Sequence, residues 1–558
     1  MNGAINTQTM LVTEDLEARI RETLQRMAEE NWTARIWDLD AELWRTEPEH
    51  VEEIRHRLGW LHLPTRVMPN VGMLTEFAES ARQFERVVLL GMGGSSLAPW
   101  CFSDIFGSPE GFPELSVLDS TVPAEVLAAT GDAAPEDCLF IVSSKSGTTS
   151  ETRAFFDYFW AEVSAAKDDP GENFVIVTDP GSPLLEAADE RNARAVFENW
   201  EDIGGRYSAL SYFGMVPAAL IGLPLRMILE QAELMATSCD PATPVDESPG
   251  AALGAFLGCC WEAGRDRVTF LTSERLATFG DWAEQLLAES TGKEGKGLIP
   301  VVGESPLDPD AYGDDRVFVY LHMGEDPTHD RMMEELVERG HPIVRIAVED
   351  PTSIGAEMYR WEFATAVAGA IMRINPFDQP NVQEAKDKTK QVLTEYAETG
   401  ELPEQEADVN EGSILHGDVR GAVKDLIDSI EPGDYFAIMA YLHRSDAIDD
   451  AIAQIRAEVA TEKRVATTFG YGPRFLHSTG QLHKGGPETG VFLQITSEGG
   501  EDVDVPGEAY DFATLKDAQA IGDLAVLREH GLRVMRVDLA DEPATNLGRL
   551  VEMIVEAV

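Results

Sequence analysis

Residues 139–151 read LFIVSSKSGTTSE, an apolar run that breaks into small hydroxyl side chains around one lysine. The apolar run predicts a buried strand, and the pattern from residue 151 onward predicts a helix after the turn. Free backbone N–H groups at the start of that helix suit the turn to binding an anion. An ordinary capped helix start uses the same residue types, so this stretch alone leaves both interpretations open.

The same order of strand, turn and helix recurs on both sides of this stretch. Residues 86–100 read RVVLLGMGGSSLAPW, which predicts a strand, a glycine-rich turn and a helix. Alternation of this kind predicts an α/β fold with doubly wound, mainly parallel sheets. Other expected strands lie at 115–120, 173–182, 266–274, 315–324 and 341–350, and in the C-terminal part at 435–442, 490–497 and 533–540.

Shifts in composition divide the chain into four parts. The Pro- and Asp-rich stretch 238–250 indicates one boundary, the acidic stretch 398–413 is typical of a linker, and the apolar stretch 216–236 predicts one long helix. The expected parts are an N-terminal helical segment at 1–60, α/β domains at 61–240 and 241–400, and a C-terminal α/β domain at 414–558.

The charge of the chain is extreme. It carries 99 acidic and 44 basic residues, a net charge of −55, and the acids are spread along its length. This charge argues against nucleic acid and anionic membranes as partners, and it indicates a halophilic surface whose self-repulsion salt screens. The five cysteines form no CxxC pair or Cys/His cluster, and no signal or membrane-spanning pattern is visible. We therefore expect a cytoplasmic protein with reduced thiols and no zinc site.

Two glycine-rich stretches follow the pattern of binding turns. In GMGGSSLAP (91–99) the third position of a dinucleotide fingerprint holds Ser96, which disfavours a nicotinamide enzyme. The small residues still let a ligand approach the backbone, although a tight turn needs nothing more. In DIGGRYSALSYFG (202–214), Arg206 follows two glycines. Its guanidinium suits stabilisation of a developing enediolate, and a surface arginine in a turn is the plain alternative.

Three later stretches carry side chains suited to proton transfer. QLLAESTGKEGKG (285–297) places Gln285 and Glu289 on one face of a helix, where apolar neighbours favour a carboxylate base. NPFDQPNVQEAK (375–386) sets Gln379 and Lys386 seven residues apart, and GPRFLHSTGQLHKGGP (472–487) contains His477 among small residues. The plain alternatives are a surface glutamate, an ordinary helix start and a polar loop.

The order of these motifs resembles that of phosphoglucose isomerase over roughly residues 60–395. Five independent motifs agree in order, and the glutamate and lysine motifs also agree in internal spacing. The resemblance implies two α/β domains of sugar-isomerase type. It also implies interconversion of glucose 6-phosphate and fructose 6-phosphate through an enediolate, in glycolysis and gluconeogenesis, without a metal or cofactor.

The resemblance assigns roles residue by residue. Glu289 matches the base that moves a proton between C2 and C1, Arg206 the enediolate-stabilising residue, and Lys386 the lysine near the ring oxygen. The residues that it implies for binding the sugar phosphate are Ser95, Ser144, Lys145, Ser146, Thr149, Gly205, Gln285 and Gln379.

One departure from the family pattern concerns the ring-opening histidine. Bacterial members carry a His-Ser-x-Gly-Gln motif soon after the glutamate, but residues 297–315 contain no histidine. The pattern appears instead as LHSTGQ (476–481), in a chain that continues about 170 residues past Lys386. The whole chain looks like the isomerase half of bacterial transaldolase–phosphoglucose isomerase fusions. We therefore expect the C-terminal domain to deliver His477, either within the chain or from the partner in a homodimer.

Two alternatives remain open from the sequence. An enzyme of this type that also accepts mannose 6-phosphate fits the same motifs, because the phosphate turn leaves the width of the pocket undefined. A non-catalytic sugar-phosphate-binding regulatory protein on the same fold is the alternative from another class. Such a sensor has no need to keep Glu289, Arg206 and Lys386 together.

Overall fold

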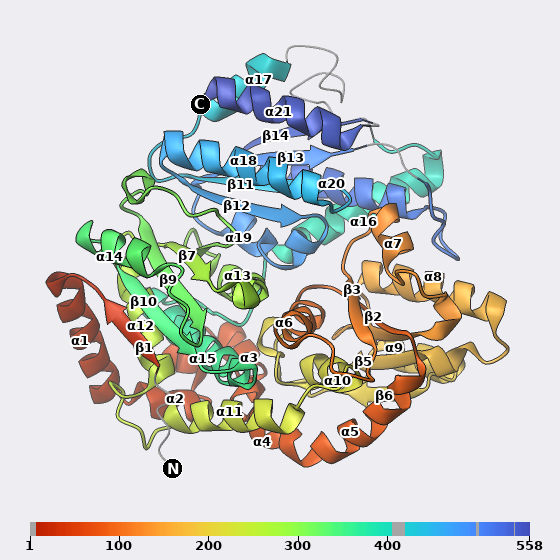
Figure 1. Cartoon of the computed structure of the whole chain (residues 1–558), viewed down its shortest axis with the longest axis horizontal. Coiled ribbons are helices and arrows are strands. Elements are labelled where there is room, and N and C mark those ends of the chain that lie inside the picture. Colours follow the sequence, from red (N-terminus) through yellow and green to blue (C-terminus); the bar gives the residue numbers. More distant parts are fainter. Residues whose placement is uncertain (1–6, 404–418, 498–500, 541) are drawn as a thin grey trace.

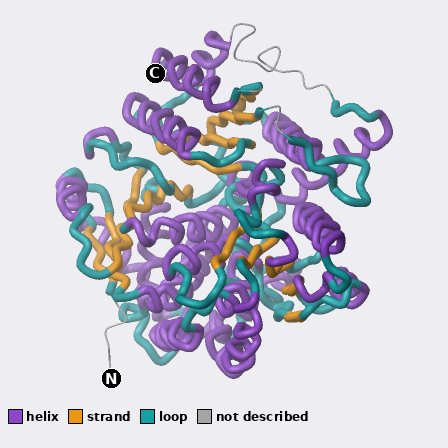
Figure 2. The backbone as a smooth tube through the Cα atoms, turned by 45° about the vertical axis from the view of Figure 1, so that its right-hand side comes forward, coloured by secondary structure: helices purple, strands orange, loops and turns teal. Residues whose placement is uncertain are grey.

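Three sheets organise the chain in a computed structural model that describes residues 7–403, 419–497, 501–540 and 542–558 (Figure 1). The first two sheets have five strands each, and the third has four. Figure 2 shows that helices surround the strands of all three sheets. The α/β class with mainly parallel sheets is therefore confirmed.

The first sheet has the strand order β3-β2-β4-β5-β6, and all its strands are parallel. Its central strands are apolar along nearly their whole length, as expected where helices cover both faces of a parallel sheet. The strands are β2 (Arg86–Gly91), β3 (Glu114–Leu118), β4 (Cys138–Ser143), β5 (Phe174–Thr178) and β6 (Ala195–Glu198). The helices between and after them are α6 (Leu97–Phe106), α7 (Pro123–Ala128), α8 (Ser150–Ala166), α9 (Pro183–Glu190) and α10 (Tyr212–Leu220).

The second sheet has the order β1-β10-β9-β7-β8, and only its edge strand β1 is antiparallel. Its strands are β1 (Gln8–Leu11), β7 (Arg267–Thr272), β8 (Ile299–Val301), β9 (Arg316–Met323) and β10 (Ile343–Val348). Its helices are α11 (Leu225–Ser238), α12 (Pro249–Glu262), α13 (Ala277–Thr291), α14 (Asp330–Glu338) and α15 (Ile354–Met372). Helix α15 is buried along its entire length, so it lies at the centre of this part of the molecule.

The third sheet, in the order β12-β11-β13-β14, is entirely parallel and belongs to the C-terminal part of the chain. Helix α16 (Val382–Thr399) leaves the second unit and packs against α20, through an apolar cluster of Val392, Ala518 and Ile521. The strands are β11 (Tyr435–Tyr441), β12 (Ala466–Tyr471), β13 (Gly490–Thr496) and β14 (Arg533–Asp538). The helices are α17 (Val419–Asp428), α18 (Asp446–Lys463), α19 (Gly480–Gly485), α20 (Phe512–Glu529) and α21 (Pro543–Ala557).

The apolar cores follow this division only for the third sheet, because one core spans the first two sheets. One large core runs from the N-terminal helices α1 (Glu14–Glu29) and α2 (Trp32–Trp37) through both faces of α15 to residue 377. The C-terminal sheet has a core of its own, formed with α17, α18 and α21. A separate cluster joins Ile299 and Val301 of the second sheet to Tyr435 and Phe475, so the C-terminal domain is anchored directly on the second sheet.

The structure corrects three details of the sequence prediction. The N-terminal segment 1–60 contains not only helices but also strand β1, because Gln8–Leu11 pairs with the exposed edge of β10. The stretch 216–236 forms two helices, α10 and α11, because Gly222 takes a left-handed φ of 79° and Pro224 has no N–H to donate. The short strands β6, β8 and β12 were not expected.

The two predicted boundary segments differ in structure. Helix α16 extends to Thr399 into the predicted linker 398–413, and residues 404–413 lie outside the described residues. Residues 238–250 form the connection between α11 and α12. Among the helices of the described ranges, none combines the length and apolar character needed to cross a membrane.

Candidate active site

A cavity of about 700 Å³ opens at the carboxyl ends of strands β2, β4 and β5. The chain passes from β2 to β3 on one side of the first sheet and then returns to β4 on the other side of β2. Ligands in doubly wound sheets bind at such a point, because the turns on the two sides diverge and leave a crevice. The turns that line the cavity are therefore the glycine-rich turn after β2 and the hydroxyl turn after β4.

All the residues that the sequence singled out line this one cavity. They come from the first sheet, from helix α13, from the start of α16 and from the C-terminal domain, and they span more than 380 positions of the chain. The set is Ser95, Ser144, Lys145, Ser146, Thr149, Gly205, Arg206, Gln285, Glu289, Gln379, Lys386 and His477.

The hydroxyl turn between β4 and α8 is held by its own side chains. Ser144 Oγ accepts a hydrogen bond from the N–H of Gly147 at 3.2 Å and lies 3.1 Å from Thr149 Oγ1. Thr149 is the residue before the first turn of α8, but its side chain caps no backbone N–H of the helix. The N–H groups of the first turn therefore receive no cap from Thr149, and the anion-binding interpretation of this stretch stays a prediction.

Lys145 lies at the rim of the cavity and is already paired. Its ammonium contacts the carboxylate of Asp179, which follows β5, and donates to the carbonyl of Glu201 at 3.4 Å. Burial raises the pKa of Asp179, and the neighbouring Lys145 partly opposes that effect. Lys145 therefore ties the turn after β4 to the turn after β5, and its charge is partly balanced.

The glycines after β2 allow other parts of the protein to approach closely. Gly93 has a φ of 54°, and a Cβ atom there would lie 2.7 Å from the carbonyl oxygen of His477. A Cβ atom at Gly94 would lie 2.1 Å from the carbonyl oxygen of Gly205. The sequence suggested that these small residues make room for a ligand. In the structure they make room for the backbone of the segments that carry His477 and Gly205.

Arg206 is fixed inside the protein by acceptors on three sides. Its side chain is 2% exposed. Its Nε donates to Ser290 Oγ at 2.7 Å, and Nη2 donates to the carbonyls of Pro376 and Asp378 at 2.7 and 2.9 Å. The remaining Nη1 faces Gln379 Oε1 at 3.0 Å. The guanidinium therefore presents one edge toward the cavity in a fixed orientation.

Glu289 stands beside that edge. Its Oε1 lies 3.7 Å from Nη1 of Arg206, and its Oε2 accepts from Gln285 Nε2 at 3.1 Å. The side chain of Glu289 is 13% exposed, and the intervening Leu286 and Leu287 are fully buried on the other side of α13. A carboxylate held this way can accept a proton from a bound molecule while the guanidinium stabilises the negative charge that forms.

His477 reaches the cavity from the C-terminal domain of the same chain. Its Nε2 lies 2.9 Å from Oε1 of Glu151, the carboxylate in the first turn of α8. Glu151 is 4% exposed and also accepts from Gln519 Nε2 at 2.7 Å. Burial raises the pKa of Glu151, but the charge and hydrogen bond of His477 lower it further, to about 2. Glu151 therefore stays ionised and holds the imidazole in place.

The histidine segment is tied to the two other functional helices. Gln481 accepts from the N–H of Asn381 at 2.8 Å and donates to the carbonyl of Gly292 at 2.8 Å. Asn381 precedes α16, which carries Lys386, and Gly292 follows α13, which carries Glu289. The geometry thus links histidine, lysine and glutamate through one amide side chain.

Sequence reasoning missed two supporting residues. Glu151 ends the stretch 139–151 that predicted the anion-binding turn, yet its partner lies 326 positions away, so no local pattern marks it. Lys293, in the glutamate motif, donates to the carbonyls of Asn375 and Asp378 at 2.8 and 2.6 Å and supports the turn before Gln379. Burial lowers the pKa of Lys293 to about 8, although Asp378 acts against this.

Lys386 lines the cavity from the first turns of α16, and its side chain has no hydrogen bond or ion pair with any residue that the structure describes. Among those same described residues, no group of three or more histidine, cysteine, aspartate or glutamate side chains is placed to hold a metal ion.

Two solved structures share the fold. A hypothetical protein from Thermus thermophilus aligns with a TM-score of 0.57 and 24% identity, over 69% of this chain and 99% of that one. A glucose-6-phosphate isomerase from Chlamydia trachomatis aligns with a TM-score of 0.53 and 20% identity, over 70% of this chain and 89% of that one. At these identities the likeness shows a shared α/β fold.

Sequence comparison identifies the family to which the chain belongs. The family model of phosphoglucose isomerase matches residues 76–297. Glucose-6-phosphate isomerase from Citrifermentans bemidjiense is 30% identical over 373 residues, which cover 58% of this chain and 69% of that protein. A probable glucose-6-phosphate isomerase from Haloarcula marismortui is 27% identical over 417 residues, covering 67% and 93%. The chain belongs to the phosphoglucose isomerase family.

Proposed function

We propose that this isomerase interconverts glucose 6-phosphate and fructose 6-phosphate through an enediolate, with the cavity residues in the roles that the family resemblance assigns. The observation that carries the proposal is the meeting of Glu289 and Arg206, 3.7 Å apart, on the wall of the cavity that also contains the hydroxyl turn. An aldose–ketose isomerisation needs these two functions, a base and a stabiliser of the anion that forms.

The phosphate of the substrate binds at the hydroxyl turn. Ser144, Ser146 and Thr149 supply hydroxyls there, and the first turn of α8 supplies backbone N–H groups and the positive end of the helix dipole. The phosphate does not react. Its binding energy therefore serves to orient C1 and C2 against the groups that do react.

Ring opening falls to His477 and Lys386. A proton must move from the C1 hydroxyl to the ring oxygen, and a histidine is suited to this near neutral pH. Glu151 fixes the orientation of the imidazole through its 2.9 Å contact with Nε2. Lys386 donates a proton or a hydrogen bond near the ring oxygen.

Glu289 then transfers the proton between the two carbons. It removes the acidic proton at C2 of the open aldose and returns it to C1, and Arg206 stabilises the enediolate between these steps. A preorganised donor of this kind contributes about 3 to 4 kcal/mol to such a step. Gln285 supports the carboxylate through its 3.1 Å hydrogen bond.

The supply of His477 from the same chain supports a site that one chain completes. Gln285 Nε2 donates to the backbone carbonyl of His477 at 2.8 Å, and a Cβ atom at Gly93 would lie 2.7 Å from the same oxygen, so the C-terminal segment is seated directly on the active-site turns. We infer that His477 acts within its own chain. The predicted homodimer and the predicted cytoplasmic location remain predictions.

A coupled assay that detects glucose 6-phosphate formed from fructose 6-phosphate tests the proposal. It is best run at several salt concentrations, because the net charge of −55 predicts higher activity and stability when salt screens the repulsion. A parallel assay with mannose 6-phosphate decides whether the C2 epimer is also accepted. Binding of fructose 6-phosphate without turnover at any salt concentration would instead identify a regulatory sugar-phosphate sensor.

A further inference from the structure

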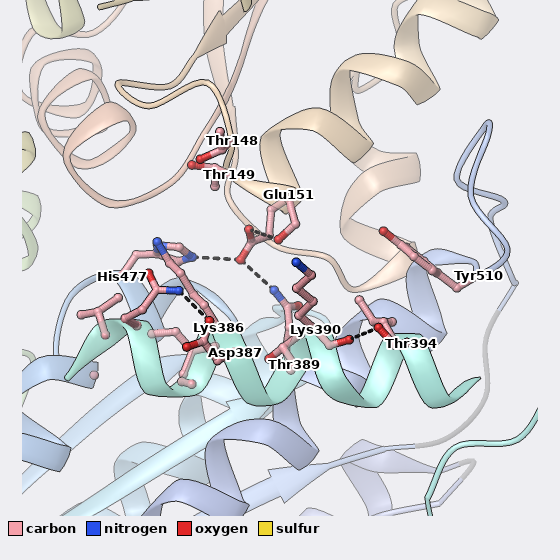
Figure 3. A pocket seen from close by; sticks show the side chains of 18 of the residues that line it. Thr148, Thr149, Glu151, Lys386, Asp387, Thr389, Lys390, Thr394, His477 and Tyr510 are labelled. Atoms are coloured by element: carbon pink, nitrogen blue, oxygen red, sulfur yellow. Dashed lines mark hydrogen bonds and ion pairs between the residues drawn. The ribbon is translucent and has the colours of Figure 1, made fainter. Parts of the chain in front are cut away.

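A second cavity of about 680 Å³ lies directly beside the active-site cavity. Its walls are α16, the first turn of α8 and parts of the C-terminal domain that include Tyr510 and Gln519 (Figure 3). The two cavities share the residues Thr149, Val382, Lys386 and His477. Whatever occupies the second cavity therefore contacts groups that are assigned to ring opening.

Two lysines on one face of α16 line this cavity, Lys386 and, one turn later, Lys390. Figure 3 shows the ammonium of Lys390 directed into the space between Glu151 and Tyr510. Neither lysine has a hydrogen bond or ion pair from its side chain to the described part of the chain. Adjacent like charges that form no ion pair repel each other, so this face of α16 favours a bound anion.

The other lysines show how unusual this is. The chain has 11 lysines, all within the described ranges, and only Lys386, Lys390 and the distant Lys463 lack a side-chain hydrogen bond or ion pair there. The lysines whose ammonium groups donate to an acceptor are Lys145, Lys167, Lys293, Lys296, Lys388, Lys424, Lys484 and Lys516. In a chain with 99 acidic residues, two neighbouring ammonium groups that pair with no described carboxylate indicate a site for an anionic ligand.

The remaining walls set the size and character of a ligand. Leu393, Ala397 and Ala509 provide apolar surface, and Tyr510 provides a ring and a hydroxyl. Burial raises the pKa of Tyr510 to about 12, so its hydroxyl remains a donor at neutral pH. The acidic groups that face the cavity are Glu151, which His477 balances, Asp387, which accepts from Gln383 at 2.7 Å, and Glu508.

We infer that this second cavity binds a small organic anion with at least two negative charges, a phosphate ester or a polycarboxylate, and that the bound anion slows the isomerase. Lys390 and Lys386 hold the charges, and Tyr510 packs against the carbon skeleton. Because Lys386 also serves the ring oxygen of the substrate, an anion in the second cavity draws its ammonium away and lowers turnover. Binding of the anion does not depend on the proposed function. The inhibition of turnover rests on the proposed function.

The binding test uses titration calorimetry with citrate and with glycerol 3-phosphate as probes, one for each source of negative charge. Equilibrated fructose 6-phosphate is present at saturation to fill the active site. The variants are Lys390→Met and, as the matched control on the same helix, Lys388→Met, which removes a lysine that pairs with Glu529 outside the cavity. We expect one equivalent of at least one probe per wild-type or control chain, and at least tenfold weaker binding to Lys390→Met.

The kinetic test uses the same variants. We expect the bound probe to lower kcat at saturating substrate in the wild type and the control but not in Lys390→Met, whose kcat without probe is unchanged. A second variant, Ala397→Trp, fills the cavity without removing charge and should also abolish the kcat effect. Failure of both probes to bind beside the substrate, equal binding to Lys390→Met, or purely competitive inhibition would overturn the inference. If neither the wild type nor any variant isomerises sugar phosphates, the proposed function is wrong. The calorimetry still shows whether the second cavity binds an anion.

Discussion

The first and second sheets are built alike, yet they contribute to the active site in different ways. Each has five strands with helices on both faces. The first sheet presents turns at the carboxyl ends of β2 and β4, made of glycine and hydroxyl residues. The second presents the side of helix α13, with Gln285 and Glu289. The comparison teaches that one architecture can carry a part suited to binding an anion and a part suited to proton transfer, depending on which residues follow the strands.

Removal of the proposed base from the second unit should abolish proton transfer and leave phosphate binding by the first unit intact. In Glu289→Gln we expect kcat to fall by about three to four orders of magnitude, because the amide cannot accept the C2 proton. Calorimetry with fructose 6-phosphate should show binding within a few-fold of the wild type. Glu294→Gln, in the exposed loop after α13, is the control and should keep its activity; near-normal turnover in Glu289→Gln would refute the assignment.

The third sheet can be tested through its histidine. His477→Ala should lower kcat by about two to three orders of magnitude, since ring opening loses its proton carrier. Mixing this variant with Glu289→Gln should restore no activity, because each chain supplies both residues to its own site. Recovery of a sizeable fraction of wild-type activity in the mixture would show that His477 is exchanged between chains.

The first sheet should show an effect on binding more than on chemistry. Ser144→Ala removes a hydroxyl from the phosphate turn and one acceptor for the N–H of Gly147. Loss of a hydrogen bond to a charged group typically costs about 1.5 to 3 kcal/mol, so we expect KM to rise at least tenfold with a smaller change in kcat. The steady-state rates of the coupled assay check this. A fall in kcat with an unchanged KM would contradict the assigned division of roles.

The smallest expected effect concerns a carboxylate on another face of the same helix α13. Burial, with the nearby charge of Asp281, raises the pKa of Glu284 to about 8. The folded state therefore keeps a proton that the unfolded state releases near pH 4.5, and stability falls as the pH rises through this interval. Between about pH 6 and pH 7 we expect the wild type to lose about 1.4 kcal/mol more unfolding free energy than Glu284→Gln. Denaturant unfolding at the two pH values measures the difference, and identical slopes for both proteins would contradict it.

Local sequence patterns and the order of the motifs were enough to predict the fold class and the residues that line the cavity. Strands that end in small polar residues indicated the α/β class, and the parallel arrangement brought their turns to one edge, where Ser95, Ser144 and Arg206 meet. Contacts between distant segments had no such signal. The pairing of β1 with β10, the hold of Glu151 on His477 and the closeness of Gly93 to His477 depend on tertiary packing that periodicity does not reveal.

The late position of His477 in the chain has a consequence for the order in which the enzyme becomes active during its synthesis. The hydroxyl turn and Glu289 leave the ribosome first, whereas strands β13 and β14, which complete the sheet beside the histidine segment, are made last. With the roles proposed above, a nascent chain carries the proposed phosphate turn and the proposed base before it carries a seated ring-opening histidine. Under that proposal, turnover requires the strands that follow the histidine segment in the chain.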